Sequence, residues 1–201
     1  PPKPKEPSVG KKINESLDDY QTFDGQPYNY NITAAVPSDA ASYKKFVISD
    51  TLDNDLEFAG DVTIKGEAAA LFDIQKNGQT VTATVKEGKF QDLAKYSYIE
   101  LQIPAKVKNG VSGRVIENKA RINFTNENNQ EKEVESNPVR VTPPPVSKKI
   151  NEKLDEATIA ASTDFNYNVK SKLPNDITTY KSYVISDTLD ENLEAGKAVI
   201  K

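Results

Sequence analysis

Apolar and polar residues alternate along much of this chain with a period of two. In the segment YNYNITAAV (28–36) the side chains at even positions from 28 to 34 are apolar, and those between them are Asn or Thr. This alternation is typical of a β-strand with one face buried and the other in water. Further short runs, separated by Gly, Asn, Asp or Pro, predict strands at 43–50, 62–65, 71–75, 79–86, 97–103, 113–125 and 132–141. Two segments, 66–72 and 90–96, are expected to be short helical connectors. The pattern therefore predicts an all-β chain folded as a β-sandwich.

The chain contains an internal repeat. Residues 11–64 and 148–201 align without a gap at an offset of 137 (148 − 11), with 24 of 54 positions identical. Identity is concentrated in KKINE, at the start of each copy, and in VISDTLD, which follows in each. A period near 137 residues is too long for a solenoid unit of roughly 20–50 residues, so each repeat is expected to be a separate domain.

Proline marks the joints between these domains, because PPKPKEP precedes the first copy and TPPP precedes the second. Such segments are extended and semi-rigid. We expect a proline-rich linker at 1–7, a complete repeat at 8–142, a proline linker at 143–147 and the first part of a second repeat at 148–201. That last part has less than half of a repeat, so it is expected not to form the same closed core alone and to be less ordered than 8–142.

The composition excludes several classes of function. The 201 residues include no Cys, His, Met or Trp, and the formal net charge is −4. Without Cys and His, the chain lacks thiolate metal sites, disulfides and the commonest general base, so we expect no metal, no cofactor and no turnover enzyme. The mild acidity argues against a nucleic-acid partner. No apolar run approaches the roughly 20 residues of a membrane span, and no signal peptide pattern is seen.

Three polar residues occupy strand positions where the alternation calls for an apolar one. Lys11 shares the inward face of VGKKI, Asp50 that of FVISDTL, and Asn118 that of IENKARINF. Burying a charge is strongly unfavourable, and burying an unpaired amide costs a few kcal/mol, unless such groups satisfy one another. The three side chains are therefore expected to meet in one core.

The stretches SVGKKI, YNYNITAAVPSDAASYKKFVISDTLDNDLEF and ENKARINFTN resemble the isopeptide-forming, immunoglobulin-like domains of Gram-positive pilins and cell-wall adhesins, the fimbrial isopeptide-formation class. The resemblance implies an immunoglobulin-like β-sandwich in which Lys11 is the nucleophile, Asn118 the acceptor and Asp50 the catalytic acid. In the second copy Lys148 and Asp187 match, and the asparagine falls at 255 (118 + 137), beyond this chain. The resemblance also implies an extracellular, cell-surface location with cell-wall anchoring through regions outside this chain.

The implied chemistry is consistent with the side chains. Burial lowers the pKa of a lysine and so releases the free amine, which is the attacking form. Burial also disfavours a charged carboxylate, so that Asp50 can persist as an acid, hydrogen-bond the Asn118 carbonyl oxygen and pass a proton to the departing ammonia. The reaction happens once in each molecule, so the chain is not an enzyme.

These residues also allow simpler interpretations. Lys11 can extend along a sheet edge with its ammonium in water, and its neighbour Lys12 is a second candidate on the other face. Asp50 can cap a turn. For the acceptor, Asn123 and Asn126 remain alternatives to Asn118. A calcium site built from Asp50, Asp53, Asp55 and Glu57 is disfavoured because the spacing lacks the glycine and terminal glutamate of an EF-hand loop.

The predicted function is a structural stalk or spacer repeat of a bacterial surface adhesin or pilus-like protein, whose first partners are the neighbouring repeats of its own chain. Tandem near-copies with proline joints are what a length-setting spacer needs. The alternative is a ligand-binding adhesin domain that recognises a host matrix protein or glycan, with an aromatic surface at Tyr20, Phe23 and Tyr28. The chain has no LPxTG sorting signal and no YPK-type pilin motif, so polymerisation into a pilus is not supported.

Overall fold

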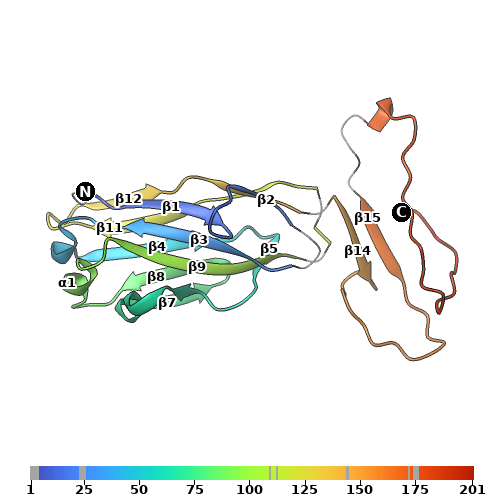
Figure 1. Ribbon diagram of the computed structural model, residues 1–201, viewed down its shortest axis with the longest axis horizontal. Helices are drawn as coiled ribbons and strands as arrows, with labels where there is room; N and C mark the ends of the chain where they lie inside the picture. Colours follow the sequence, from blue (N-terminus) through green and yellow to red (C-terminus); the bar gives the residue numbers. More distant parts are fainter. Residues whose placement is uncertain are drawn as a thin grey trace.

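The computed structural model describes residues 5–22, 26–108, 110–111, 113–143, 145–171, 173 and 177–201. The first repeat is built almost wholly of strands (Figure 1): β1 (Ser8–Ile13), β2 (Asp19–Gln21), β3 (Tyr28–Ala35), β4 (Lys45–Thr51), β5 (Leu56–Phe58), β6 (Thr63–Ile64), β7 (Phe72–Asn77), β8 (Thr80–Val85), β9 (Tyr98–Val107), β10 (Ile116–Asn118), β11 (Ala120–Thr125), β12 (Glu131–Glu135) and β13 (Val139–Thr142).

The helical segments of the first repeat are short connectors, as predicted for 66–72 and 90–96. They are η1 (Ala40–Ser42), η2 (Gly66–Leu71) and α1 (Phe90–Leu93). Within the described residues, no helix has the length and apolar character needed to cross a membrane.

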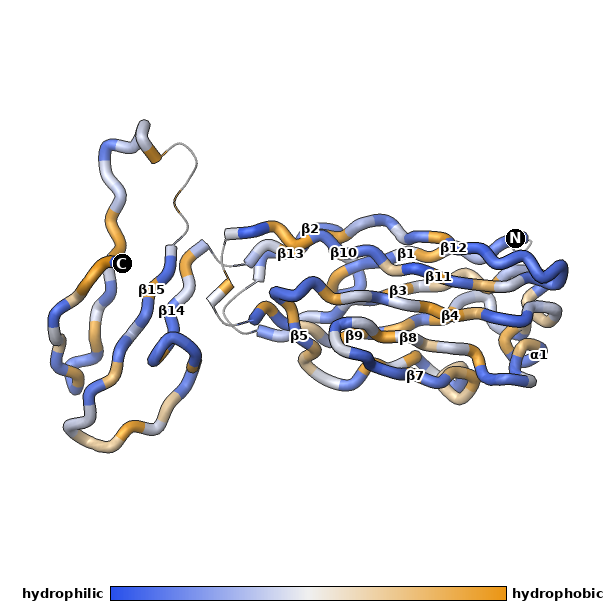
Figure 2. Tube along the Cα trace, turned by 180° about the vertical axis from the view of Figure 1, so that it is seen from behind, coloured by the Kyte–Doolittle hydropathy of each residue, from blue (hydrophilic) through white to orange (hydrophobic). Residues whose placement is uncertain are grey.

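Two five-stranded sheets enclose the core. One has the order β1-β3-β9-β5, with β6 also paired to β9, and the other has the order β12-β11-β4-β8-β7. All pairs in both sheets are antiparallel. Along their strands hydrophobic and hydrophilic residues alternate (Figure 2), and the inward residues form one buried cluster. The predicted all-β sandwich is therefore confirmed, and the period of two is its physical basis.

A third, three-stranded sheet corrects two of the predicted strands. The segment predicted as one strand at 113–125 is divided at Lys119 into β10 and β11, and the one at 132–141 is divided into β12 and β13. In each case the two halves lie in different sheets: β11 and β12 belong to the second five-stranded sheet, whereas β10 and β13 pair with each other in the third sheet, where β13 runs parallel to β2. The alternation keeps its parity through the break at Lys119, but it shifts by one position between Ser136 and Val139, both of which are buried. Within each strand it gives the face of each residue but not its partner strand. The strands β2 and β5 were not predicted at all.

The turn after β1 explains part of the identity between the repeats. Asn14 and Glu15 have φ angles of 47° and 70°, in the left-handed region that non-glycine residues seldom adopt. The Asn14 side chain stabilises this turn by accepting a hydrogen bond from the Asn29 backbone N–H at 2.9 Å. Asn151 and Glu152 repeat the same turn, with φ angles of 48° and 69°. The identity of the KKINE segment in the two copies therefore reflects this shared turn as well as the lysine that precedes it.

Among the described residues of the second repeat, the main regular structure is one hairpin. Strand β14 (Val146–Ile150) pairs with β15 (Tyr167–Ser171), and η3 (Ile177–Thr179) follows. Lys148 lies opposite Val169, just as Lys11 lies opposite Ile32 in the first repeat.

The VISDTLD block of the second repeat, 184–190, is not a strand, although its equivalent in the first repeat lies largely within β4. The reason is the absence of neighbours. In the first repeat β4 lies between β8 and β11, whose equivalents begin at 217 (80 + 137) and 257 (120 + 137), beyond this chain. Apolar side chains such as Val184 and Ile185 consequently remain exposed.

Candidate functional site

Lys11 lies in β1 with its side chain inside the sandwich and only 1% of its surface exposed. It is paired with Ile32 of β3, and its Nζ atom lies 4.2 Å from the centre of the Tyr30 ring. The same atom forms an ion pair with the carboxylate of Asp50. Burial lowers the pKa of Lys11, and this desolvation outweighs the opposing effect of the Asp50 charge. Burial thus makes the free amine, which is the nucleophilic form of lysine, easier to reach than it is in water.

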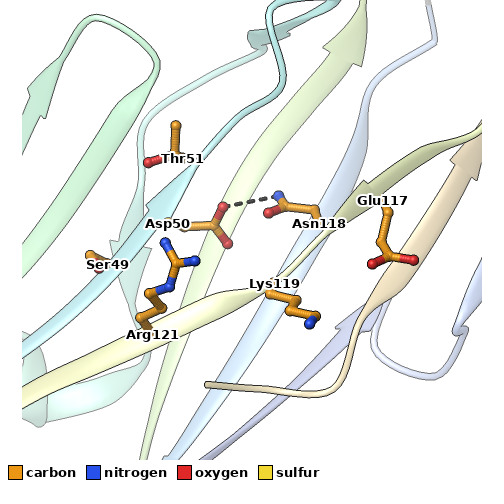
Figure 3. Close-up of a pocket in the computed structure, with 7 residues that line it drawn as sticks. All are labelled: Ser49, Asp50, Thr51, Glu117, Asn118, Lys119 and Arg121. Carbon is orange, nitrogen blue, oxygen red and sulfur yellow. Dashed lines mark hydrogen bonds between the residues drawn. The ribbon is translucent and has the colours of Figure 1, made fainter. Parts of the chain in front are cut away.

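Asp50 lies in β4, in the middle of the second sheet, between Val81 of β8 and Ala120 of β11. Its side chain is buried, with 2% of the residue exposed. The two carboxylate oxygens have different partners: Oδ2 contacts Nζ of Lys11, and Oδ1 accepts a hydrogen bond from Nδ2 of Asn118 at 2.9 Å (Figure 3). One carboxylate therefore bridges the amine and the amide.

Asn118 is the last residue of β10 and is 6% exposed. The break at Lys119 separates it from β11, so Asn118 belongs to the third sheet while Ala120, two residues later, pairs with Asp50. Lys11, Asp50 and Asn118 thus come from three different sheets. The structure brings together all three residues that the sequence placed on inward faces.

The orientation of the Asn118 amide differs from the one expected. The acid was expected to bond the carbonyl oxygen, whereas the structure turns the amide nitrogen toward Asp50. The reason is charge: a carboxylate paired with the Lys11 ammonium is a hydrogen-bond acceptor, and only the NH₂ group of the amide has protons to donate. In this arrangement Asp50 lies next to the atom that would leave as ammonia.

Two tyrosines of β3 complete the surroundings of the lysine. The hydroxyl groups of Tyr28 and Tyr30 are 3.2 Å apart, and their rings meet edge to face at 5.2 Å. Burial is the largest cause of a raised pKa at both hydroxyls, so both remain neutral. Sequence reasoning placed both side chains on the inward face but did not assign Tyr30 to the site. Its position on the strand paired with β1 was the available indication.

The alternative cross-linking residues face away from the site. Lys12 is exposed and forms an ion pair with Asp18 at 2.9 Å. Asn123 lies on the opposite face of β11 from the buried residues, and Asn126 follows that strand and hydrogen-bonds within the next turn. None of these three is near the buried carboxylate.

The acids considered for calcium are occupied by cations of the protein. Arg114 donates hydrogen bonds to both Asp53 and Asp55, and its hydrogen bond is the main cause that lowers the pKa of Asp53. Glu57 pairs with Lys106 at 3.2 Å. In the part of the chain that the structure describes, no group of three Asp or Glu side chains is arranged to hold a metal ion.

The proposed aromatic ligand surface is not present as predicted. Tyr28 is buried in the core, and Tyr20 is half-buried with its ring 5.6 Å from that of Tyr28. Phe23, the third residue of that prediction, lies outside the described residues.

The second copy brings together the two site residues that it contains. Nζ of Lys148 lies 2.7 Å from a carboxylate oxygen of Asp187, and 4.0 Å from the centre of the Tyr167 ring. Their side chains are 38% and 34% exposed, in contrast to complete burial in the first copy. The lysine and aspartate of the second copy therefore form the same ion pair, with their side chains partly exposed.

A polar hollow of about 300 Å³ borders the site on one side (Figure 3). It is lined by residues of β4 and of the junction between β10 and β11: Ser49, Asp50, Thr51, Glu117, Asn118, Lys119 and Arg121.

With this geometry in hand, comparison with known proteins gives the family. The model of the cell surface antigen I/II C2 terminal domain matches residues 4–139. The chain belongs to this family. Platelet adherence protein A of Streptococcus gordonii is 69% identical over 193 residues, which are 96% of this chain and 5% of that protein. This chain thus spans about a twentieth of the length of that relative.

Solved structures agree with the family. The major pilin subunit BcpA of Bacillus cereus matches 72% of this chain and 42% of its own, with 39% identity and a TM-score of 0.65. The C-terminal fragment of the major pilin GBS80 of Streptococcus agalactiae matches 72% of this chain and 58% of its own, with 18% identity and a TM-score of 0.59, and supports the fold alone.

The comparisons confirm the immunoglobulin-like sandwich and the resemblance to isopeptide-type domains of pilins and adhesins. By their names these relatives are an adherence protein and a major pilin subunit. The antigen I/II domain is therefore of the surface adhesin and pilin class.

Proposed function

We propose that this domain is a structural stalk repeat of a bacterial surface adhesin, stabilised by a self-made amide bond between Lys11 and Asn118. One observation carries the proposal: a single buried carboxylate, that of Asp50, contacts both the amine of Lys11 and the amide nitrogen of Asn118.

The first step is the release of a free amine. Lys11 transfers a proton to Asp50, which yields a neutral amine and a carboxylic acid. On the lysine side, desolvation favours the neutral form, and the exchange leaves no separated charges in the interior. The Nζ lone pair then attacks the Cγ atom of Asn118.

Asp50 next acts on the leaving group. Its acid proton passes to Nδ2 of Asn118, which lies 2.9 Å from Oδ1, while Nζ returns a proton to the carboxylate. The Cγ–Nδ2 bond breaks, the Nζ–Cγ amide remains, and ammonia departs. The balance is one amine plus one primary amide giving one secondary amide plus one ammonia. The polar hollow beside Asn118 offers the ammonia a route to solvent.

The fold supplies the remaining rate enhancement. The reacting groups are held by β1, β4 and β10 in three sheets, so the reaction is intramolecular and has the high effective concentration of oriented groups. The bond encloses about 107 residues (118 − 11). Closing a loop of about 100 residues stabilises a domain by roughly 4–5 kcal/mol through the unfolded state.

This bond suits a load-bearing stalk. A pulling force that enters at β1 and leaves after β13 would pass through the cross-link and leave residues 12–117 unloaded. The domain's own partners are then the neighbouring repeats, and the cell-wall anchor and any site for a host matrix protein or glycan lie elsewhere in the longer protein. Platelet adherence, named for the relative from Streptococcus gordonii, is in this view a property of the whole adhesin that the stalk presents.

Intact mass tests the proposal. The parent chain is expected to weigh about 17 Da less than its sequence, because one ammonia is lost when the bond forms. The variants Lys11→Ala and Asn118→Ala are expected to have their full sequence mass. Lys12→Ala is the matched control and keeps the deficit, since Lys12 is exposed on the other face of β1. A parent chain of full mass after folding contradicts the proposal.

A further inference from the structure

Asn137 forms two hydrogen bonds with the backbone of Lys11, the lysine of the proposed cross-link. Its Oδ1 atom accepts a hydrogen bond from the Lys11 N–H at 2.9 Å, and its Nδ2 atom donates one to the Lys11 carbonyl oxygen at 2.8 Å. Strand β1 is at the edge of its sheet, with β3 on one side. Asn137 therefore satisfies both backbone groups that Lys11 presents on the open side, in the way that a neighbouring strand would.

The segment that carries Asn137 is itself held at the site. Ser136 donates its backbone N–H to the Ala120 carbonyl oxygen at 2.9 Å, and its Oγ atom accepts from the Ala120 N–H at 2.8 Å. The same hydroxyl donates to the Asn137 carbonyl oxygen at 2.7 Å. Ala120 is in turn the strand partner of Asp50.

The other end of this segment is attached to the acceptor. Pro138 follows Asn137 and restricts its backbone, and Val139 is the strand partner of Asn118. The four residues from 136 to 139 thus contact Lys11 directly, Asn118 through its strand pair, and Asp50 through Ala120.

From this arrangement we infer that Asn137 is a positioning residue for cross-link formation, which fixes the Cα atom of Lys11 so that its amine reaches Asn118. The inference rests on the proposed cross-link. A lysine side chain has four rotatable bonds beyond Cα, and its amine needs a defined origin to attack one carbon. A displacement of about 1 Å in a reacting group can slow a reaction about 100-fold.

The sequence offered little indication of this role. The ESNPV segment, 135–139, was predicted as part of one continuous strand, and Asn137 is 126 residues from Lys11 in the chain. The side chain of Asn137 reaches the edge of β1 because the chain leaves the strand conformation between the end of β12 and the start of β13.

The test is the time course of the mass deficit in freshly purified full-length chain. Asn137→Ala is expected to fold but to lose ammonia at least about 10-fold more slowly than the parent. Asn137→Asp keeps the shape and one hydrogen bond and is expected to be slowed as well, because it loses the donor to the Lys11 carbonyl oxygen. Asn123→Ala, on the outer face of β11, is the matched control and should react like the parent.

A second control separates positioning from stability. Ile74→Ala removes packing from the edge strand β7, away from the site, and is expected to lower the melting temperature yet still react completely. If Asn137 served stability alone, unreacted chains of its variants would be unfolded and added sucrose, which favours the folded state, would restore the reaction. Positioning instead predicts folded, unreacted chains that sucrose does not rescue.

The outcomes distinguish this inference from the proposed function. A parent chain without the deficit of about 17 Da refutes the cross-link itself. A parent with the deficit, together with Asn137→Ala and Asn137→Asp reacting at the parental rate or being rescued by sucrose, overturns the role of Asn137 alone.

Discussion

Asn118 donates its side-chain amide to Asp50 over 2.9 Å, although the two residues lie 68 positions apart and in strands of different sheets. Because Lys11 contacts the other oxygen of the same carboxylate, the acid stands between the two groups that the proposed bond would join.

Replacing the acid is expected to block the reaction while the shape of the site is kept. In Asp50→Asn the lysine has no proton acceptor and the leaving amide no proton donor, so cross-linking should slow by about 100-fold or more. The intact mass of this variant after purification should therefore equal its full sequence mass, because Lys11 and Asn118 have not reacted. Asp53→Asn, which changes the ion pair with Arg114 and the hydrogen bond from the Asp55 N–H but no contact of the site, should keep the deficit. Complete reaction of Asp50→Asn would contradict the assigned role.

Loss of the acceptor is expected to lower the free energy of unfolding, because without the cross-link the unfolded chain regains conformational freedom. Asn118→Ala should unfold with roughly 4–5 kcal/mol less free energy than the parent, which corresponds to about 12–20 °C in melting temperature for a domain of this size. Thermal unfolding followed by circular dichroism measures this. Asn123→Ala, which leaves the site intact, should melt within a few degrees of the parent, and equal melting of parent and Asn118→Ala would argue against a bond.

The Asn118→Ala variant is also expected to gain a pH dependence that the parent lacks. Its Lys11 remains an amine, and burial lowers the pKa of that amine below its ordinary value of 10.5. Between the lowered value and 10.5 the unfolded chain binds more protons than the folded one, so the free energy of unfolding should rise with pH and level off above 10.5.

Urea unfolding at pH values from about 8 to about 10.5 measures this slope. In the parent, the nitrogen of residue 11 is part of an amide and does not titrate, so that contribution should be absent. Equal slopes in the variant and the parent would mean that Lys11 is an amine in the parent too, which contradicts the cross-link.

Under a pulling force, the cross-link should shorten the contour length that the domain releases when it unfolds. When the parent is pulled between Val9 and Thr142, only the 24 residues after Asn118 (142 − 118) can extend, a contour of about 8 nm. The Lys11→Ala variant should release all 134 residues (142 − 8), or about 47 nm. Single-molecule pulling measures both, and a full-length release from the parent would rule out the tether.

The second repeat should remain unreacted in this chain. Lys148 meets Asp187, but the acceptor position at 255 (118 + 137) is beyond residue 201. The mass deficit should therefore correspond to one ammonia, about 17 Da, and not two. Lys148→Ala should leave that deficit unchanged. A second loss of ammonia would require a different acceptor for Lys148.

The alternation in the sequence was sufficient to place the three site residues inside the domain. Lys11, Asp50 and Asn118 each follow the parity of their apolar neighbours, and each is buried. This works because successive side chains of a strand point to opposite faces, whatever the strand pairs with. The repeat offset likewise identified Lys148 and Asp187, since equivalent positions in two copies of one fold occupy equivalent places.

The tertiary structure alone decided which strands meet and how the polar groups face one another. The breaks at Lys119 and at 136–138, the Tyr30 ring beside the amine and the grip of Asn137 on Lys11 all depend on contacts between distant parts of the chain. The amide of Asn118 turned its nitrogen toward Asp50 because the carboxylate already pairs with an ammonium. A period of two specifies a face but carries no information about a partner strand, so the sequence by itself determined what is buried, and the fold determined what each buried group contacts.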